Sequence, residues 1–123
     1  AIDMNTGEHA WMVPNGDGPR DHPLLRDLDL PPLGIPGRPT PLVTRTLLFL
    51  GEGSDAISGI GEGMWGRMFR AYDKATGEVV WETELPGGTT SQPASYVHQG
   101  KQYIVVPVAD SEHPAEFVAL GLP

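Results

Sequence analysis

The segment AYDKATGEVVW, residues 71–81, repeats the N-terminal segment AIDMNTGEHAW, residues 1–11, without a gap. Six of the eleven positions are identical, and they include a tryptophan and a glycine. Repetition of one short unit along a chain is typical of folds that stack a supersecondary unit on the next copy of itself. The repeat therefore decides the fold that the sequence predicts.

Each copy of the repeat predicts a β-hairpin. In the second copy, the alternating residues around Phe69 and Ala71 favour a strand, and the stretch from Asp73 to Gly77 favours a tight turn. Asp and Thr side chains hydrogen-bond turn backbone, and glycine accepts a positive φ. Residues 78–85 alternate and are rich in β-forming side chains, so they predict the returning strand.

Further strands are expected on both sides of this hairpin. Residues 42–50 are rich in β-forming side chains and end at a Gly-Glu-Gly sequence. Residues 94–98 and 102–108 predict a second hairpin with its turn at 99–101, and residues 117–122 predict a last short strand. These strands, with the repeat, predict an all-β protein.

Two stretches predict irregular connections. Residues 14–40 are rich in proline and glycine, and they allow one helical turn within residues 21–30 before Pro31 and Pro32 stop it. Residues 51–66 form a glycine-rich loop that contains Trp65. A connection as long as 14–40 is typically functional or packed on something larger.

The composition excludes several functional classes. The chain has 123 residues, is 39% hydrophobic, and carries a net charge of −8, which disfavours binding to nucleic acid or an anionic membrane. It has no cysteine, so disulfides, thiolate catalysis and cysteine-based zinc sites are excluded. It shows no transmembrane segment and no signal peptide. Because it begins with Ala1 and not with methionine, we interpret its start as a cut inside a longer sequence.

The doubled motif resembles the tryptophan-docking motif of quinoprotein dehydrogenases, enzymes that use pyrroloquinoline quinone (PQQ). Residues 39–49, 70–77 and 100–106 are similar to the last blades of the membrane-bound glucose dehydrogenase branch, and residues 117–123 look like its closing strand. The resemblance implies about two blades of an eight-bladed β-propeller, built from antiparallel four-stranded sheets. It implies that the two motif tryptophans pack between blades against the alanine and glycine of the motif; these structural residues are Ala1, Gly7, Trp11, Ala71, Gly77 and Trp81.

On this interpretation the chain is one C-terminal propeller segment with four parts. Residues 1–13 end one blade, residues 14–40 are the connection, residues 41–86 form the blade with the second tryptophan motif, and residues 87–123 supply the closing strands.

Three residues are candidates for a cofactor-binding pocket edge: His113, Asp110 and Trp65. The glucose branch carries a histidine in the loop before its final strand, and His113 is the candidate counterpart. Imidazole suits proton transfer near neutral pH, but the alternative is a solvated turn before Pro114. Trp65 either lines a pocket or anchors its own loop. No catalytic or metal-ligating residue is assigned, because the family's catalytic aspartate and calcium ligands come from earlier blades.

Two other patterns favour the plainer interpretation. Residues 61–66 fit G-x-G-x-x-G, but a strand follows them where a dinucleotide site needs a helix, so they predict a loop. Asp21, Asp27 and Asp29 lie in a connection beside Arg26, which predicts a solvated surface and not a pair of catalytic carboxylates.

The resemblance implies the C-terminal portion of a PQQ-dependent sugar or alcohol dehydrogenase, periplasmic and inactive alone. PQQ and calcium would belong to the full-length enzyme, with neither expected on this chain by itself. The alternative is a non-catalytic propeller fragment that acts by self-assembly or partner binding. Two blades cannot close a ring, so the expected partners are the remaining blades or copies of the same chain in an oligomer, unless the chain folds compactly in another all-β form.

Overall fold

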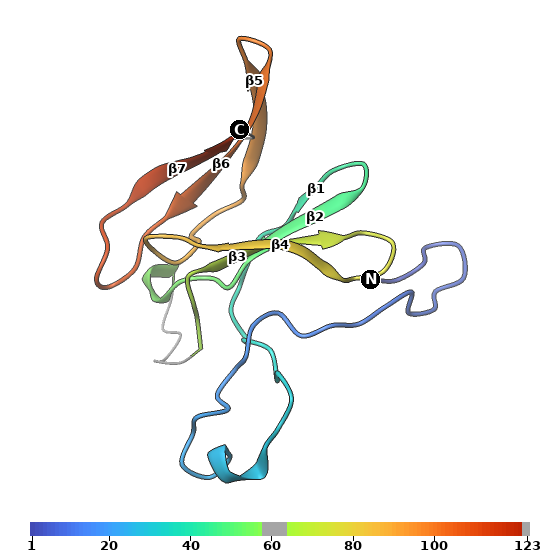
Figure 1. Ribbon diagram of the computed structural model, residues 1–123, viewed down its shortest axis with the longest axis vertical. Coiled ribbons are helices and arrows are strands. Elements are labelled where there is room, and N and C mark those ends of the chain that lie inside the picture. Colours follow the sequence, from blue (N-terminus) through green and yellow to red (C-terminus); the bar gives the residue numbers. More distant parts are fainter. Residues whose placement is uncertain (58–63, 122–123) are drawn as a thin grey trace.

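The computed structural model describes residues 1–57 and 64–121, and these form two antiparallel sheets joined in chain order (Figure 1). The all-β prediction is confirmed, since no α-helix occurs in the described ranges. The first sheet has the strand order β1-β2-β3-β4 and the second β5-β6-β7. The elements are η1 (Arg26–Leu28), β1 (Leu42–Val43), β2 (Leu47–Gly51), η2 (Asp55–Ile57), β3 (Met68–Asp73), β4 (Val79–Glu84), β5 (Ala94–His98), β6 (Lys101–Val108) and β7 (Glu116–Gly121).

The stretch 42–50 was expected to be one strand, and this expectation is wrong. Thr44 reverses the chain between β1 and β2, which pair with each other through Leu42↔Phe49. The Thr44 hydroxyl both accepts a bond from the Leu47 N–H and donates one to the Leu47 carbonyl, each at 3.0 Å. A threonine side chain can close a turn in this way inside a run that otherwise favours a strand.

The two copies of the repeat fold into the same turn. Gly7 N–H donates to the Asp3 carbonyl at 2.7 Å, and Gly77 N–H donates to the Asp73 carbonyl at 2.8 Å. In both copies the aspartate side chain also accepts a bond from the backbone N–H two residues further on. Both glycines have a positive φ, 77° and 80°, which other residues adopt only with strain.

Trp11 of the first copy packs on the turn of the second copy. Its indole N–H donates to the Lys74 carbonyl at 2.9 Å, and a Cβ added to Gly77 would lie 2.7 Å from the indole ring. Gly77 is therefore required both for its backbone conformation and for the close approach of the ring. The equivalent tryptophan and glycine of the repeat, Trp81 and Gly7, make no such contact among the described residues. Trp81 is 43% exposed, and a Cβ added to Gly7 would meet nothing within 4 Å.

We expect a Gly77→Ala substitution to displace Trp11, because the new methyl group would overlap the indole ring. The matched control is Gly7→Ala, which carries the same φ strain, about 1 kcal/mol, without a ring to displace. In dilute protein, the indole N–H resonance of Trp11 should move toward its solvent-exposed position in Gly77→Ala alone. Equal spectra for the two variants would contradict the contact.

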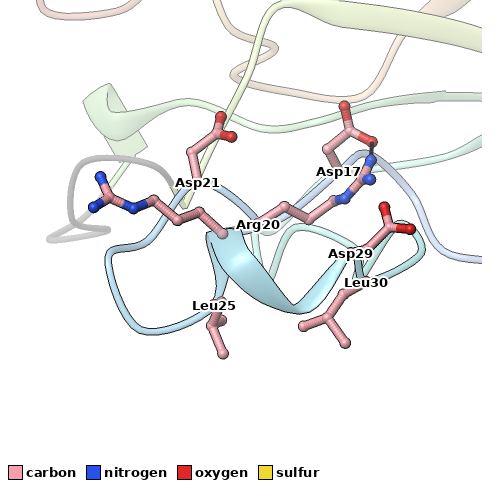
Figure 2. Close-up of a pocket in the computed structure, with 7 residues that line it drawn as sticks. Asp17, Arg20, Asp21, Leu25, Asp29 and Leu30 are labelled. Atoms are coloured by element: carbon pink, nitrogen blue, oxygen red, sulfur yellow. Dashed lines mark hydrogen bonds and ion pairs between the residues drawn. The ribbon is translucent and has the colours of Figure 1, made fainter.

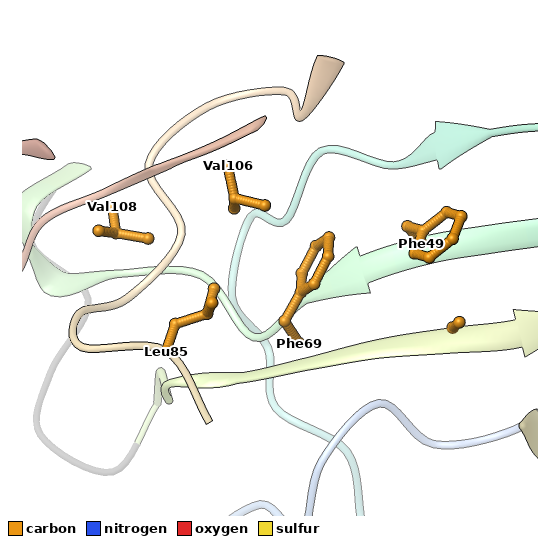
Figure 3. Close-up of a cluster of buried hydrophobic side chains, with 6 residues drawn as sticks. Phe49, Phe69, Leu85, Val106 and Val108 are labelled. Atoms are coloured by element: carbon orange, nitrogen blue, oxygen red, sulfur yellow. The ribbon is translucent and has the colours of Figure 1, made fainter. Parts of the chain in front are cut away.

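The core lies between the two sheets (Figure 3). Phe69 and Val106 are fully buried, and the rings of Phe49 and Phe69 stack with centroids 6.1 Å apart. Both faces are built by strand alternation, which sends every second side chain toward the neighbouring sheet. The buried apolar cluster consists of Phe49, Phe69, Ala71, Leu85, Val106 and Val108.

The connections between the strands lie at two opposite ends of the sheets. The tight turns after β1, β3 and β5 lie at one end, which we call the turn end. The described residues of the other connections, 52–57, 64–67, 85–93 and 109–115, lie at the other end, which we call the loop end. There an isolated bridge, Thr89↔Val108, joins the β4–β5 connection to β6. Figure 1 shows the turns of the two sheets pointing in different directions, while the loop-end segments lie near one another.

Candidate functional site

The loop end collects the buried polar side chains of the described ranges. Glu52, Ser54, Thr89 and Asp110 are each less than 9% exposed, and all four lie on loop-end connections. Burying a polar group is costly unless it is hydrogen-bonded. Within the part of the chain that the structure describes, no buried side-chain nitrogen or oxygen lacks a partner.

Hydrogen bonds at the loop end cross from one sheet to the other. Gly53 N–H donates to the Thr89 hydroxyl at 3.1 Å, and the Ser54 hydroxyl donates to the Ala109 carbonyl. Ser111 N–H donates to Asp55 at 3.0 Å. These bonds join the connection after β2 to the two connections that flank the second sheet, so the loop end is one bonded unit.

Asp110 is the centre of this unit. Its side chain has no exposed surface and accepts four hydrogen bonds, from the Arg67 Nε at 2.8 Å, the Arg67 Nη2 at 3.1 Å, and the backbone N–H groups of Gly88 and Glu112. The hydrogen bond from Arg67 is the largest cause that lowers the pKa of Asp110, from 3.8 to about 2. A carboxylate that accepts four hydrogen bonds holds its loop in place and is a poor base.

Arg67 also interacts with two residues other than Asp110. Its Nη2 also contacts the exposed Glu112 at 3.1 Å, and its guanidinium lies 6.0 Å from the centroid of the Trp65 ring. That separation is within the range of a cation–π contact. The hydrogen bond to Asp110 is the main cause that raises the pKa of Arg67.

His113 lies on the same loop, one turn away from Asp110. The backbones of the two residues exchange hydrogen bonds at 3.0 and 3.3 Å, and the His113 Nε2 lies 2.9 Å from Glu116. The ring packs beside Gly87, where an added Cβ would approach it to 3.1 Å. The His113 side chain keeps 25% of its surface exposed, so it remains accessible from outside.

The structure thus brings the three sequence candidates into one cluster around a residue that the sequence interpretation missed. Asp110 and Trp65 both contact Arg67, and His113 is bonded to Asp110 through the backbone. A signal for Arg67 was available, because two carboxylates in the loop 109–115 require a cation if they are buried. The sequence could not show that Arg67 pairs with Asp110, because the two residues are 43 positions apart.

A second polar cluster ties the long connection to the first sheet. Arg70 contacts the buried Glu52 at 2.6 Å and the exposed Glu82 at 3.0 Å. The Tyr72 hydroxyl donates to the side chain of Asn15 at 2.8 Å, and the Asn15 amide donates to the Gly51 carbonyl at 2.7 Å. Burial is the main cause that raises the pKa of Tyr72. Asn15 therefore fixes the start of the connection against β2 and β3.

The connection itself closes at a neck and carries a small pocket on its outer part. Backbone bonds join Ile35 to Asn15 and Leu33 to Asp17, at 2.8 and 2.9 Å. Figure 2 shows the pocket of about 240 Å³, where Arg20 contacts Asp17 at 3.3 Å. The three aspartates that were expected to be solvated, Asp21, Asp27 and Asp29, are exposed, and Arg26 is exposed beside them. The expected helical turn is η1.

The remaining motif residues lie in the two hairpins. Ala71 is buried and pairs in register with Trp81, whereas Ala1 is exposed and its amino group donates to the Trp11 carbonyl at 2.7 Å. The first half of the G-x-G-x-x-G sequence, residues 61–63, lies outside the described residues, as does Leu122 of the expected last strand. No helix of the described ranges is long and apolar enough to cross a membrane.

Comparison with known proteins places this geometry in context. Residues 1–104 match the family model described as "PQQ: Glucose/ethanol/alcohol dehydrogenase, beta-propeller domain". The chain is 34% identical over 115 residues to the quinoprotein glucose dehydrogenase of Gluconobacter oxydans, strain 621H, which covers 85% of the chain. It is 34% identical over 110 residues to a probable quinate dehydrogenase (quinone) of Xanthomonas campestris pv. juglandis, and 33% identical over 109 residues to the glycerol dehydrogenase large subunit of Gluconobacter thailandicus, each match covering 86% of the chain.

The chain spans only 12–13% of the length of these relatives. No solved structure matches it.

Proposed function

Because the chain belongs to the glucose/ethanol/alcohol dehydrogenase β-propeller family, we propose that it is the C-terminal part of the propeller of a PQQ-dependent sugar or alcohol dehydrogenase. In this role it supplies two blades and a loop that borders the pocket. The observation that carries the proposal is the loop end, where connections from both sheets hold His113 partly exposed on the same loop as the buried Asp110, which is paired with Arg67. Loops held by a rigid β scaffold are the usual place for binding residues.

Of this cluster, we propose that His113 faces a bound molecule, because its ring is partly exposed and its one side-chain partner, Glu116, lies at the surface. Its position is fixed by the backbone bonds to Asp110 and by the contact with Gly87. Trp65 would border the same region through its contact with Arg67. Asp110 contributes by holding the loop, since all of its accepting capacity is used within the protein.

The described residues do not fit a complete site for calcium or for PQQ. Calcium takes six to eight oxygen ligands, and no three acidic or histidine side chains of the described ranges are close enough to share a metal ion. PQQ is an anion that would need cationic partners, and Arg67 and Arg70 already pair with carboxylates of the chain. We therefore propose that both groups bind to the whole enzyme. From the resemblance to its family, we also propose a periplasmic location for that enzyme.

The isolated chain is expected to show no turnover when it is mixed with PQQ, calcium and glucose or quinate in a dye-linked assay. The reason is that, in the part of the chain that the structure describes, no three acidic or histidine side chains lie close enough together to hold the calcium ion. The longer polypeptide of the same reading frame, which should carry further copies of the tryptophan motif upstream of Ala1, is expected to oxidise one of these substrates when PQQ is added. His113→Ala in that polypeptide should lower turnover, while the exposed Asp27→Ala serves as a control.

Turnover by the isolated chain would contradict its assignment as an incomplete part. A reading frame without further motifs would contradict the proposed enzyme.

A second candidate function, assembly without redox activity, is favoured by one specific observation. Trp81 is 43% exposed although it occupies the same motif position as Trp11, which is packed on a neighbouring turn.

A further inference from the structure

The imidazole ring of His113 is held by the protein along one edge. Its Nε2 lies 2.9 Å from the Oε1 of Glu116, and its Cδ2 lies beside Gly87, where an added Cβ would approach it to 3.1 Å. These two ring atoms are neighbours, so both contacts are made by the same edge. The His113 side chain keeps 25% of its surface exposed. The opposite edge of the ring, which carries Nδ1, is therefore the edge that faces outward.

The Nδ1 of His113 has no hydrogen-bond partner among the residues that the structure describes, where the ring bonds only through Nε2. Over the same residues, no buried side-chain nitrogen or oxygen lacks a partner, so Nδ1 belongs to the exposed atoms of the ring. An imidazole nitrogen in this position can bond a water molecule or a ligand.

Glu116 and His113 are both carried on backbone that the fold holds in place. Glu116 is the first residue of β7, and it pairs in register with Val108, which is buried in the core. The backbone of His113 exchanges hydrogen bonds with Asp110 at 3.0 and 3.3 Å. Between the two residues lies Pro114, whose ring fixes one backbone torsion. The contact between the imidazole and the carboxylate is therefore set by the fold of the loop.

The carboxylate of Glu116 determines which nitrogen of the neutral His113 ring carries the hydrogen. An ionised carboxylate only accepts hydrogen bonds, so the nitrogen that it faces has to donate. The neutral ring is then the tautomer with hydrogen on Nε2, and Nδ1 keeps a lone pair. The other tautomer would place the Nε2 lone pair 2.9 Å from a carboxylate oxygen, and the two would repel each other. The bond made by one ring nitrogen thus sets the state of the other.

The other carboxylates of the same loop do not compete for the ring. Asp110 accepts its hydrogen bonds from Arg67 and from two backbone N–H groups. Glu112 is bonded to Arg67. Among the described residues, Glu116 is therefore the one acidic side chain that bonds the imidazole of His113.

We propose that Glu116 is a positioning residue, which keeps His113 in the Nε2–H tautomer so that Nδ1 accepts a hydrogen bond from a hydroxyl group of the bound molecule. The tautomer is a property of the chain itself, whereas the bond to a hydroxyl group rests on the proposed function. An acceptor at Nδ1 favours a ligand that offers a donor at this point, as a polyol or a sugar does. A carbonyl or carboxylate oxygen in the same place would meet a lone pair. Carboxylates fix the tautomer of catalytic histidines in the same way.

Nitrogen NMR on the whole 123-residue chain tests the tautomer without any enzyme activity. Long-range proton–nitrogen correlations of a neutral imidazole distinguish hydrogen on Nε2 from hydrogen on Nδ1, and His113 should show the Nε2–H pattern. Because histidine in water already favours this tautomer, the deciding sample is Glu116→Lys, whose ammonium group donates and cannot accept. This variant should shift the neutral ring toward Nδ1–H. The matched control, Asp27→Lys, makes the same charge change at a side chain that is 88% exposed and should leave the pattern unchanged.

Steady-state kinetics on the longer polypeptide test the role toward the substrate. His113→Ala and Glu116→Lys should each lower kcat/KM about tenfold, which corresponds to the loss of one hydrogen bond. The double variant should be no worse than His113→Ala, because Glu116 acts through the ring alone. Asp27→Lys should keep the wild-type value.

The two measurements separate failure of this inference from failure of the proposed function. An unchanged tautomer in Glu116→Lys, or full activity of that variant beside an impaired His113→Ala, would overturn the positioning role of Glu116. Full activity of His113→Ala would contradict the proposed place of His113 at the pocket and would overturn the bond to a hydroxyl group, whatever the tautomer.

Discussion

Replacing Phe69 by alanine is expected to lower the free energy of unfolding by about 3–5 kcal/mol. Phe69 is fully buried between the sheets and stacks on Phe49, so its removal leaves a cavity in the small core that joins them. A loss of this size is a large part of the stability of an ordinary domain. Urea denaturation followed by circular dichroism would measure it.

The control for this substitution is Phe117→Ala. Phe117 holds the same position on β7 that Phe69 holds on β3, but it is 74% exposed. In dilute protein its removal should change the free energy of unfolding by less than about 1 kcal/mol, since surface substitutions rarely cost more. Similar losses in the two variants would show that the sheets do not pack through Phe69.

Replacing Asp110 by alanine is expected to lower the free energy of unfolding by about 3 kcal/mol at pH 7. The substitution leaves the N–H groups of Gly88 and Glu112 without their acceptor and removes the buried partner of Arg67. The ion pair itself accounts for only a small part of this loss, because Arg67 is 29% exposed and its charge is screened by solvent. The matched control is Glu112→Ala: Glu112 also contacts Arg67, but its side chain is 78% exposed, so the loss should be below about 1 kcal/mol.

The Asp110 effect should depend on pH in a definite direction. The folded pKa of Asp110, about 2, lies below its ordinary value of 3.8, so the ionised carboxylate stabilises the fold fully above pH 4. This stabilisation is lost as the pH falls from the ordinary value through the folded pKa. The difference between wild type and Asp110→Ala should therefore shrink between about pH 4 and pH 2. A difference that stays constant over this range would contradict the ion pair.

The strands and the repeated turn could be predicted because the information for them is local. Asp73, Thr76 and Gly77 make the hydrogen bonds and the positive φ of their turn from neighbouring residues. Residues 3–7, which carry the same aspartate, threonine and glycine, fold in the same way. The break at Thr44 was missed because its hydroxyl closes a turn inside a run of strand-forming residues. Alternation of apolar residues alone does not reveal such a turn.

The candidate site was predictable only in part. The loop that carries Asp110 and His113 was singled out by its residues, but its cation, Arg67, comes from the connection directly before β3 of the other sheet. The anchoring of Asn15 on Tyr72 likewise joins residues that are 57 positions apart. Such pairings depend on how the two sheets pack, and a single sequence carries no direct record of that packing.

The hydrogen bonds that hold the two ends of the long connection together determine where this protein can accept insertions and deletions. Ile35 is hydrogen-bonded to Asn15, and Leu33 is hydrogen-bonded to Asp17. Asn15 is in turn bonded to the first sheet, so the two ends of the connection are held together independently of its outer part. The entropic cost of closing a loop grows only slowly with its length once its ends are fixed. The outer part around η1 is therefore a place where insertions, deletions or a fused domain can be accommodated while both sheets keep their register.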